Sequence, residues 1–247
     1  MQWVSRATGL TRAALDLLLP PRCYACGDLL VEQGQLCAAC WSGLTFISAP
    51  FCACCGYPFE HPLPGRSLCG RCQAQRPVYR RARSLLVYDD ASRRLVLALK
   101  RGDRTELARP LGRLMANHAG DLVQAADLIV PVPLHGSRLF ARRFNQSALL
   151  ARTIAKAGAR RWAATRLVRH RRTRSQGGLN HRQRQENVRR AFSLRGPVAG
   201  CTILLVDDVF TTGATVEACS RALIAGGAKA VDVLTLARVA TPAQIPI

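Results

Sequence analysis

The residues from Ile203 to Thr215 combine two acids, several threonines and a glycine in an order that could bind a phosphorylated sugar. The first four are apolar and predict a buried parallel strand, with Asp207 and Asp208 at its carboxyl end. A turn and then an alanine- and leucine-rich helix pattern follow. A helix N-terminus after such a turn can hold one phosphate through backbone N–H groups and hydroxyls. The predicted phosphate ligands are Thr211, Thr212, Gly213, Ala214 and Thr215.

The two carboxylates precede this phosphate site, where they would meet ribose hydroxyls directly or through Mg²⁺ and water. The alternative is a generic strand–helix junction whose aspartates cap the helix. The order of all thirteen residues favours the sugar phosphate. It resembles the motif by which type I phosphoribosyltransferases bind 5-phosphoribosyl-1-pyrophosphate (PRPP).

Most of the cysteines lie in two similar sets of paired Cys-x-x-Cys knuckles between residues 23 and 72. Ten residues separate the knuckles of the first set and thirteen those of the second. In a cytoplasmic protein this favours metal over disulfides, because two knuckles complete a tetrahedral Cys₄ zinc site. We expect one or two Zn²⁺ ions, and the pairing of the knuckles stays open, interleaving included. The predicted ligands are Cys23, Cys26, Cys37, Cys40, Cys52, Cys55, Cys69 and Cys72.

The zinc is expected to be structural, because a closed Cys₄ site has no open coordination position. A segment of about fifty residues with few large apolar side chains could hardly fold without it. Cys54 is interpreted as a bystander, and Cys201 and Cys219 as small buried side chains.

Positive charge is concentrated in one segment. The net charge is +21, and from Arg138 to Arg195 there are 17 arginines and lysines against one acid, Glu186. A field so one-sided attracts the phosphates of nucleotides or nucleic acids. The alternative is a solvated basic surface that only keeps the protein in solution.

Residues 1–21 show apolar side chains at helical spacing, interrupted by Arg12 and Asp16. They lack a clear cleavage site, so a docking helix is predicted in place of a signal peptide. A helix lying on a membrane surface is the alternative. No apolar run approaches the roughly 18 residues of a transmembrane helix. We therefore expect a cytoplasmic protein, with attachment to the periphery of the inner membrane left open.

The predicted fold class is α/β, with a parallel-sheet domain (83–240) after a small double zinc ribbon (22–75). Strand patterns alternate with helix patterns in the larger domain, which predicts helices on both faces of the sheet. Ligands of such sheets bind at the carboxyl ends of the strands. Strands are expected at 84–88, 127–132, 166–169, 190–194, 203–206 and 231–237, and helices at 92–101, 106–118, 145–157 and 213–225.

The stretch 170–187 is polar, rich in arginine and glutamine, and contains two adjacent glycines. A long polar loop in a compact domain is usually functional or disordered. We predict a mobile basic loop that closes over an anionic ligand, and a disordered loop is the alternative.

Together these features resemble the ComF/GntX family of phosphoribosyltransferase-like proteins, which are tied to DNA uptake and natural competence. The resemblance extends from Cys23 to about Arg238. In one departure, Arg143 stands where the family usually has glycine, which matters if the position needs positive φ. The matching residues outside the cysteines and the PRPP motif include Leu99, Lys100, Gly102, Pro131–Leu134, Arg142, Phe144, Asn145, Gln146, Thr173, Gln176, Leu179, Arg184, Asn187, Val188, Ala191 and Phe192.

The resemblance implies a type I phosphoribosyltransferase-like domain in which Asp207 and Asp208 face the ribose of PRPP. It also implies Mg²⁺ bound together with PRPP. No residue can be assigned as catalytic. The implied pyrophosphate and anion cleft consists of Lys100, Pro131, Val132, Pro133, Arg142, Asn145, Gln146 and Arg184.

Our first hypothesis is a PRPP-binding protein that handles single-stranded DNA during uptake, with a competence helicase or uptake proteins as candidate partners. The alternatives are an active phosphoribosyltransferase in nucleotide salvage or synthesis, and a PRPP-sensing regulator. Aromatic side chains are sparse near the basic segment, so DNA contact would rest mainly on arginine and depend strongly on salt. They are Phe140, Phe144, Trp162 and Phe192, of which Phe192 is expected in the core.

Overall fold

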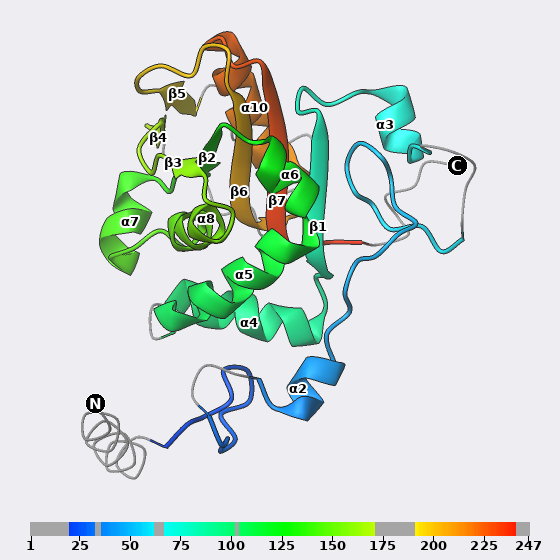
Figure 1. The fold of residues 1–247 in the computed structure, drawn as a ribbon, viewed down its shortest axis with the longest axis vertical. Helices are drawn as coiled ribbons and strands as arrows, with labels where there is room; N and C mark the ends of the chain where they lie inside the picture. Colours follow the sequence, from blue (N-terminus) through cyan, green and yellow to red (C-terminus); the bar gives the residue numbers. More distant parts are fainter. Residues whose placement is uncertain (1–19, 33–35, 62–66, 102–103, 171–190, 241–247) are drawn as a thin grey trace, which may run out of the picture.

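Five parallel strands form the sheet that organises the molecule, in the order β1-β7-β6-β2-β3 (Figure 1). The computed structural model describes residues 20–32, 36–61, 67–101, 104–170 and 191–240. The central strand β6 pairs with both β2 and β7, so its carboxyl end lies in the middle of one sheet edge. The strands are β1 (Arg81–Val87), β2 (Leu128–Pro131), β3 (Arg161–Trp162), β6 (Thr202–Phe210) and β7 (Ala230–Arg238).

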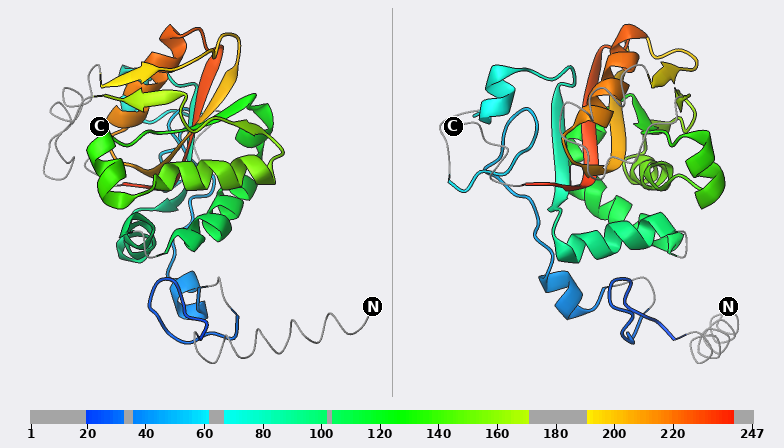
Figure 2. Two further views of the ribbon diagram at one scale, coloured as in Figure 1. Left: turned by 90° about the vertical axis from the view of Figure 1, so that its left-hand side faces the viewer. Right: turned by 180° about the vertical axis from the view of Figure 1, so that it is seen from behind.

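Helices cover both faces of this sheet, as the alternating pattern predicts. Along β6, Leu204 and Val206 pack with one set of helices, whereas Ile203 and Leu205 pack against the other face, because side chains alternate along a strand. Seen from behind in Figure 2, α10 (Ala214–Ala225, orange) lies in front of the strands. The helices on the opposite side are α4 (Asp90–Arg101), the short η1 (Thr105–Leu107), α5 (Ala108–His118), α6 (Gly120–Ala125) and α8 (Gln146–Ala157).

Three smaller elements lie beside the β3 edge of the sheet (Figure 1). Helix α7 (Gly136–Arg142) connects the end of β2 to α8. Strands β4 (Leu167–Arg169) and β5 (Phe192–Leu194) form a separate antiparallel pair. An isolated bridge joins His135 to Arg169, so this pair is held next to the start of α7.

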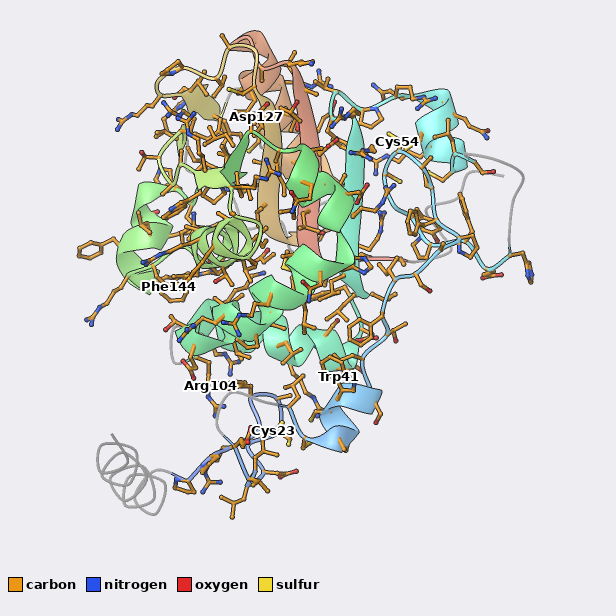
Figure 3. The ribbon with its side chains drawn as sticks, viewed as in Figure 1. Cys23, Trp41, Cys54, Arg104, Asp127 and Phe144 are labelled. Carbon is orange, nitrogen blue, oxygen red and sulfur yellow. The ribbon has the colours of Figure 1, made fainter. Side chains whose placement is uncertain are left out.

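The two cysteine-rich ribbons lie against different parts of the larger domain. The first, with the short helix α2 (Ala38–Ser42), packs through Tyr24 and Leu36 onto the core that contains α4 and α5. The second, with α3 (Gly70–Ala74), joins the core on the α10 face. In Figure 3, Cys23 lies below α4 and Cys54 lies beside β1.

Direct hydrogen bonds fix the second ribbon to the edge strand β1 and to its neighbour β7. The backbone N–H of Ala82 in β1 donates to the carbonyl of Cys54 at 2.7 Å. The guanidinium of Arg238, at the end of β7, donates to the carbonyl of Cys55 at 2.5 Å. A side chain at Gly56 would bring its Cβ within 2.5 Å of the Ala82 carbonyl, so only glycine permits this close approach.

Several sequence expectations differ from the structure. The strand predicted at 203–206 runs from Thr202 to Phe210, because its hydrogen-bonded pairing with β7 continues through the aspartates. The short helices α6 and α7 and the two-residue strand β3 were not expected. The N-terminal helix predicted at 1–21 and the basic loop predicted at 170–187 fall almost wholly outside the described residues. Within the described ranges, no helix combines the length and hydrophobicity needed to cross a membrane.

Candidate functional site

Two adjacent carboxylates near the end of β6 form the centre of the candidate site. Asp207 and Asp208 are both buried, and residues at the start of α8 hold them. The hydroxyl of Ser147 donates to Asp207 Oδ1 at 2.9 Å, and the amide of Gln146 donates to Asp208 Oδ2 at 2.9 Å. Lys100 Nζ lies 3.1 Å from the same Asp208 oxygen. The end of β6, the last turn of α4 and the first turn of α8 therefore position the acidic pair together.

Asp207 has an unusual proton affinity. Burial raises the pKa of Asp207 to about 7, and the nearby charge of Asp208 adds to the rise. Hydrogen bonds from the Asp208 backbone and Ser147, together with the charge of Lys100, oppose this increase in pKa. Asp207 therefore changes charge near neutral pH, where an ordinary aspartate is fully ionised.

The turn between β6 and α10 has the geometry expected of an anion-binding junction. Gly213 adopts φ +81°, and a Cβ at this position would lie 2.7 Å from the ring of Phe210. Only glycine satisfies both constraints. The turn leads directly into the twelve-residue helix α10, whose first N–H groups lack partners within the helix. Backbone donors and a helix dipole therefore point toward one end of the site.

A second loop, after β2, forms the facing wall of the site. Asn145 donates from Nδ2 to the carbonyl of Val132 at 3.0 Å and accepts from the backbone of Ser147 at 3.0 Å. Asn145 therefore caps the N-terminus of α8 and also holds the loop after β2 in place. Arg142 donates to Gln146 Oε1 at 3.3 Å, which connects the basic side chain to the amide that holds Asp208.

These elements enclose a cavity of about 390 Å³ at the carboxyl edge of the sheet. The acidic pair, the turn and the loop after β2 all contribute to its lining. Of the predicted residues, those that line it are Lys100, Val132, Pro133, Arg142, Gln146, Asp207, Asp208, Thr211 and Thr215.

Other predicted residues have different places. Pro131 is buried within β2, paired with Val206, and does not line the cavity. Asn145 acts behind the wall, through Val132. Thr212 and Ala214 are buried, and with Gly213 they shape the turn without lining the cavity. Arg184 lies outside the described residues.

Two arginines of the cavity wall were not among the predicted ligands. Arg138 comes from α7 and Arg169 from the end of β4. Burial lowers the pKa of Arg169, which lies over the ring of Phe192 at 5.3 Å. Both had a usable signal in the sequence: Arg138 precedes Arg142 by one helical turn, and Arg169 ends a predicted strand. Together with Lys100 and Arg142, these two arginines give the wall four cations.

Arg143 adopts the left-handed conformation, with φ +63° and ψ −5°, at the C-terminal end of α7. This is a conformation that glycine adopts at no steric cost, so the departure noted in the sequence falls on a position with positive φ.

Each ribbon forms its cluster from the four cysteines of its own pair of knuckles, from Cys23 to Cys40 in the first and from Cys52 to Cys72 in the second. In each set, the four sulfurs all lie within 4.8 Å of one another. The backbone N–H groups of Cys37 and Cys69 donate to the first sulfur of their sets, Cys23 and Cys52, at 3.3 Å. Four thiols with N–H support match the tetrahedral thiolate site that Zn²⁺ prefers. The two clusters fit two structural zinc ions, and the interleaved pairing is wrong.

Comparison with known proteins agrees with this two-part architecture. Residues 14–73 match the double zinc ribbon domain, and residues 103–244 match the phosphoribosyl transferase domain. Among solved structures, glutamine PRPP amidotransferase from B. subtilis, complexed with ADP and GMP, is 25% identical, with a TM-score of 0.37. That match covers 52% of this chain and 25% of the other, so the fold assignment rests on the domain matches and the sheet.

Full-length relatives cover nearly the whole chain. The DNA utilization protein YhgH of Salmonella typhimurium is 36% identical over 230 residues, which cover 90% of this chain and 99% of the relative. Competence protein F of Haemophilus influenzae is 29% identical over 233 residues, covering 88% and 96%. Competence protein ComFC of Bacillus subtilis is 27% identical over 219 residues, covering 85% and 87%. The chain therefore belongs to the ComF/GntX family, in which a double zinc ribbon precedes a phosphoribosyl transferase domain.

Proposed function

We propose that this protein binds PRPP together with Mg²⁺ in the cavity at the end of β6, and that it acts in handling single-stranded DNA. The observation that carries the first part is a convergence in one cavity of about 390 Å³. Two buried carboxylates, a glycine turn before a helix N-terminus and four cations meet there. These groups complement, in turn, the diol, the 5-phosphate and the pyrophosphate of PRPP.

Each part of the cavity has a distinct role in this proposal. Thr211, Thr215 and the first backbone N–H groups of α10 hold the 5-phosphate. The described residues contact Asp207 through its Oδ1 and Asp208 through its Oδ2. The other oxygen of each carboxylate accepts the hydrogen bonds from the ribose hydroxyls. The four cations of the wall face the pyrophosphate, where they offset its charge.

The same carboxylate oxygens fit a magnesium ion, which prefers one or two carboxylates plus substrate phosphates. When bound, Mg²⁺ would neutralise charge on the pyrophosphate and so assist its departure. Lys100 bridges the two halves of the site, because its ammonium group contacts Asp208 and borders the cavity. It can therefore hold the acidic pair in place while it attracts the ligand.

The DNA part of the proposal rests on two facts. The relatives that match the chain over nearly its full length are named for DNA utilization and competence. The segment from Arg138 to Arg195 holds most of the +21 net charge and contributes α7, α8 and β4 to the domain. If arginines bind the phosphates of DNA, the affinity of the protein for DNA should fall steeply as the salt concentration increases.

Calorimetric titration of the zinc-loaded protein with PRPP and Mg²⁺ tests the ligand. We expect binding by the natural sequence and by Asp121→Asn, which removes an exposed carboxylate that does not line the cavity. Asp208→Asn should abolish it while the protein stays folded. Equal affinity of Asp208→Asn and the natural sequence would overturn the site assignment.

A transferase and a PRPP sensor differ in turnover. In a transferase, a nucleophile displaces pyrophosphate from C1 of the ribose, and the cations of the wall stabilise the departing charge. Release of pyrophosphate on addition of a base, an amine or DNA, and its loss in Asp208→Asn, would identify a transferase. PRPP binding with no release across such a panel would identify a sensor.

A further inference from the structure

Helix α7 presents different residues on its two sides. Its Arg138 and Arg142, four residues apart, line the PRPP cavity. Phe140 is two residues from each, so it projects about 200° away, from the outer side of the helix. Its side chain is 88% exposed, and the neighbouring Leu139 is 44% exposed. The aromatic ring of Phe140 is therefore exposed to solvent on the same helix that forms part of the cavity wall.

Arg143, which follows the last residue of α7, carries a positive charge on a strained backbone. Arg143 has φ +63°, which disfavours every residue type with a β-carbon, and its side chain is exposed. The preceding Arg142 already places a positive charge at this helix C-terminus, so the helix dipole does not require a second one. Strained residues of this kind cluster at functional sites.

We propose that the outer side of α7, formed by Leu139, Phe140 and Arg143, is a docking platform for single-stranded DNA. One base stacks on the ring of Phe140, and an adjacent phosphate contacts the guanidinium of Arg143. An exposed aromatic ring next to a cation is the arrangement by which sequence-tolerant single-strand binders hold DNA. This α7 platform rests on the DNA part of the proposed function and is independent of PRPP binding.

The chemistry favours a single strand over a duplex. In a duplex the base faces are stacked on one another and cannot reach an exposed ring, whereas an unpaired base offers a free face. The anionic backbone also complements the stretch of sequence to which α7 belongs, since 17 basic residues stand against one acid between Arg138 and Arg195. The strand would lie on the outer side of α7 while PRPP occupies the inner side.

Fluorescence anisotropy with a short labelled oligothymidylate, measured over a range of salt concentrations, tests the α7 platform. Phe140→Leu keeps the apolar surface and removes the ring, whereas Phe140→Trp enlarges the ring. Arg143→Gly removes the cation at a position where glycine is unstrained, so its melting temperature should not fall. Arg143→Lys keeps the charge. Arg195→Gln is the matched control, because it removes an exposed arginine of the same segment outside α7.

We expect Phe140→Leu to weaken oligothymidylate binding about tenfold at constant salt, as loss of one stacked base predicts. Phe140→Trp should bind at least as tightly as the natural sequence. Arg143→Gly should reduce the slope of log K against log salt by about 0.7, the value for one phosphate contact, and Arg143→Lys should restore it. Duplex binding and PRPP affinity should not change in any of these variants.

Natural-sequence affinity in Phe140→Leu would refute stacking, since leucine retains the apolar contact. A change in Arg143→Gly no larger than that in Arg195→Gln would refute the phosphate contact. If the natural sequence does not bind the oligonucleotide at all, both the α7 platform and the DNA part of the proposed function are wrong. The PRPP titration on the same samples then still decides the cavity assignment by itself.

Discussion

Replacing Asp207 with asparagine should stabilise the ligand-free protein, and increasingly so at higher pH. The folded-state pKa of Asp207 is about 7, whereas an unfolded aspartate titrates near 3.9. Above pH 3.9 the unfolded chain ionises while the folded protein keeps the proton, so stability is lost up to about pH 7. A shift of roughly three units corresponds to about 4 kcal/mol. Asparagine cannot ionise, and its side-chain oxygen can still accept from Ser147.

Urea unfolding of both proteins from about pH 5 to pH 8, with zinc present throughout, measures this effect. The variant Asp207→Asn should have the larger free energy of unfolding, and its advantage over the natural sequence should grow by roughly 3 kcal/mol from pH 5 to pH 8. The same variant should lose PRPP binding, so that stability and function change in opposite directions. A stability difference that stays constant with pH, or decreases as pH rises, would refute the account of a carboxylate held protonated by burial and its neighbour.

Three further changes test other parts of the structure. Lys100→Gln removes the 3.1 Å ion pair with Asp208 and one cation of the wall, so the Kd for PRPP measured by calorimetry should increase at least about tenfold; an unchanged Kd would exclude Lys100 from the site. Gly213→Ala forces a β-carbon into the ring of Phe210 at positive φ, and the melting temperature should fall by about 4 to 8 °C, whereas equal melting would show that the turn relaxes freely. Cys72→Ser should reduce bound zinc from two ions to one and strongly destabilise the protein, because the second ribbon belongs to the core on the α10 face; full zinc content would remove Cys72 from the ligand set.

The parts that sequence reasoning located are those in which neighbouring residues carry the signal. The strand, turn and helix around Asp207 are contiguous, and their order alone implies an acidic pair beside an anion site. The knuckles are similarly local, since each Cys-x-x-Cys pair determines its own geometry. Gly213 in the turn and Gly56 after its knuckle both occupy positions with positive φ, as turns of this type need.

The parts that sequence reasoning missed depend on contacts between distant segments. Helix α7 is seven residues long and buries none of its side chains, so it lacks the apolar periodicity that reveals a helix. Arg169 reaches the cavity only because β4 is held beside His135 by the β4–β5 pair. The attachment of the two ribbons to different cores likewise follows from contacts such as Arg238 with Cys55, 183 residues away.

The pairing of β1 with β7 has a consequence for how the chain is made. The first strand of the sheet aligns with the last, from Arg81 opposite Asp232 to Val87 opposite Arg238. Until the ribosome has translated the roughly 140 residues between β1 and β7, β1 lacks this neighbouring strand and has beside it the segments around Phe46 and Cys54. The ribbons can load zinc early, and the second one can bond to β1 through Ala82, but its contact with β7 forms only when Arg238 has emerged. A nascent chain that stops short of this strand therefore holds folded metal knuckles next to an open sheet edge, which makes premature termination a direct route to aggregation.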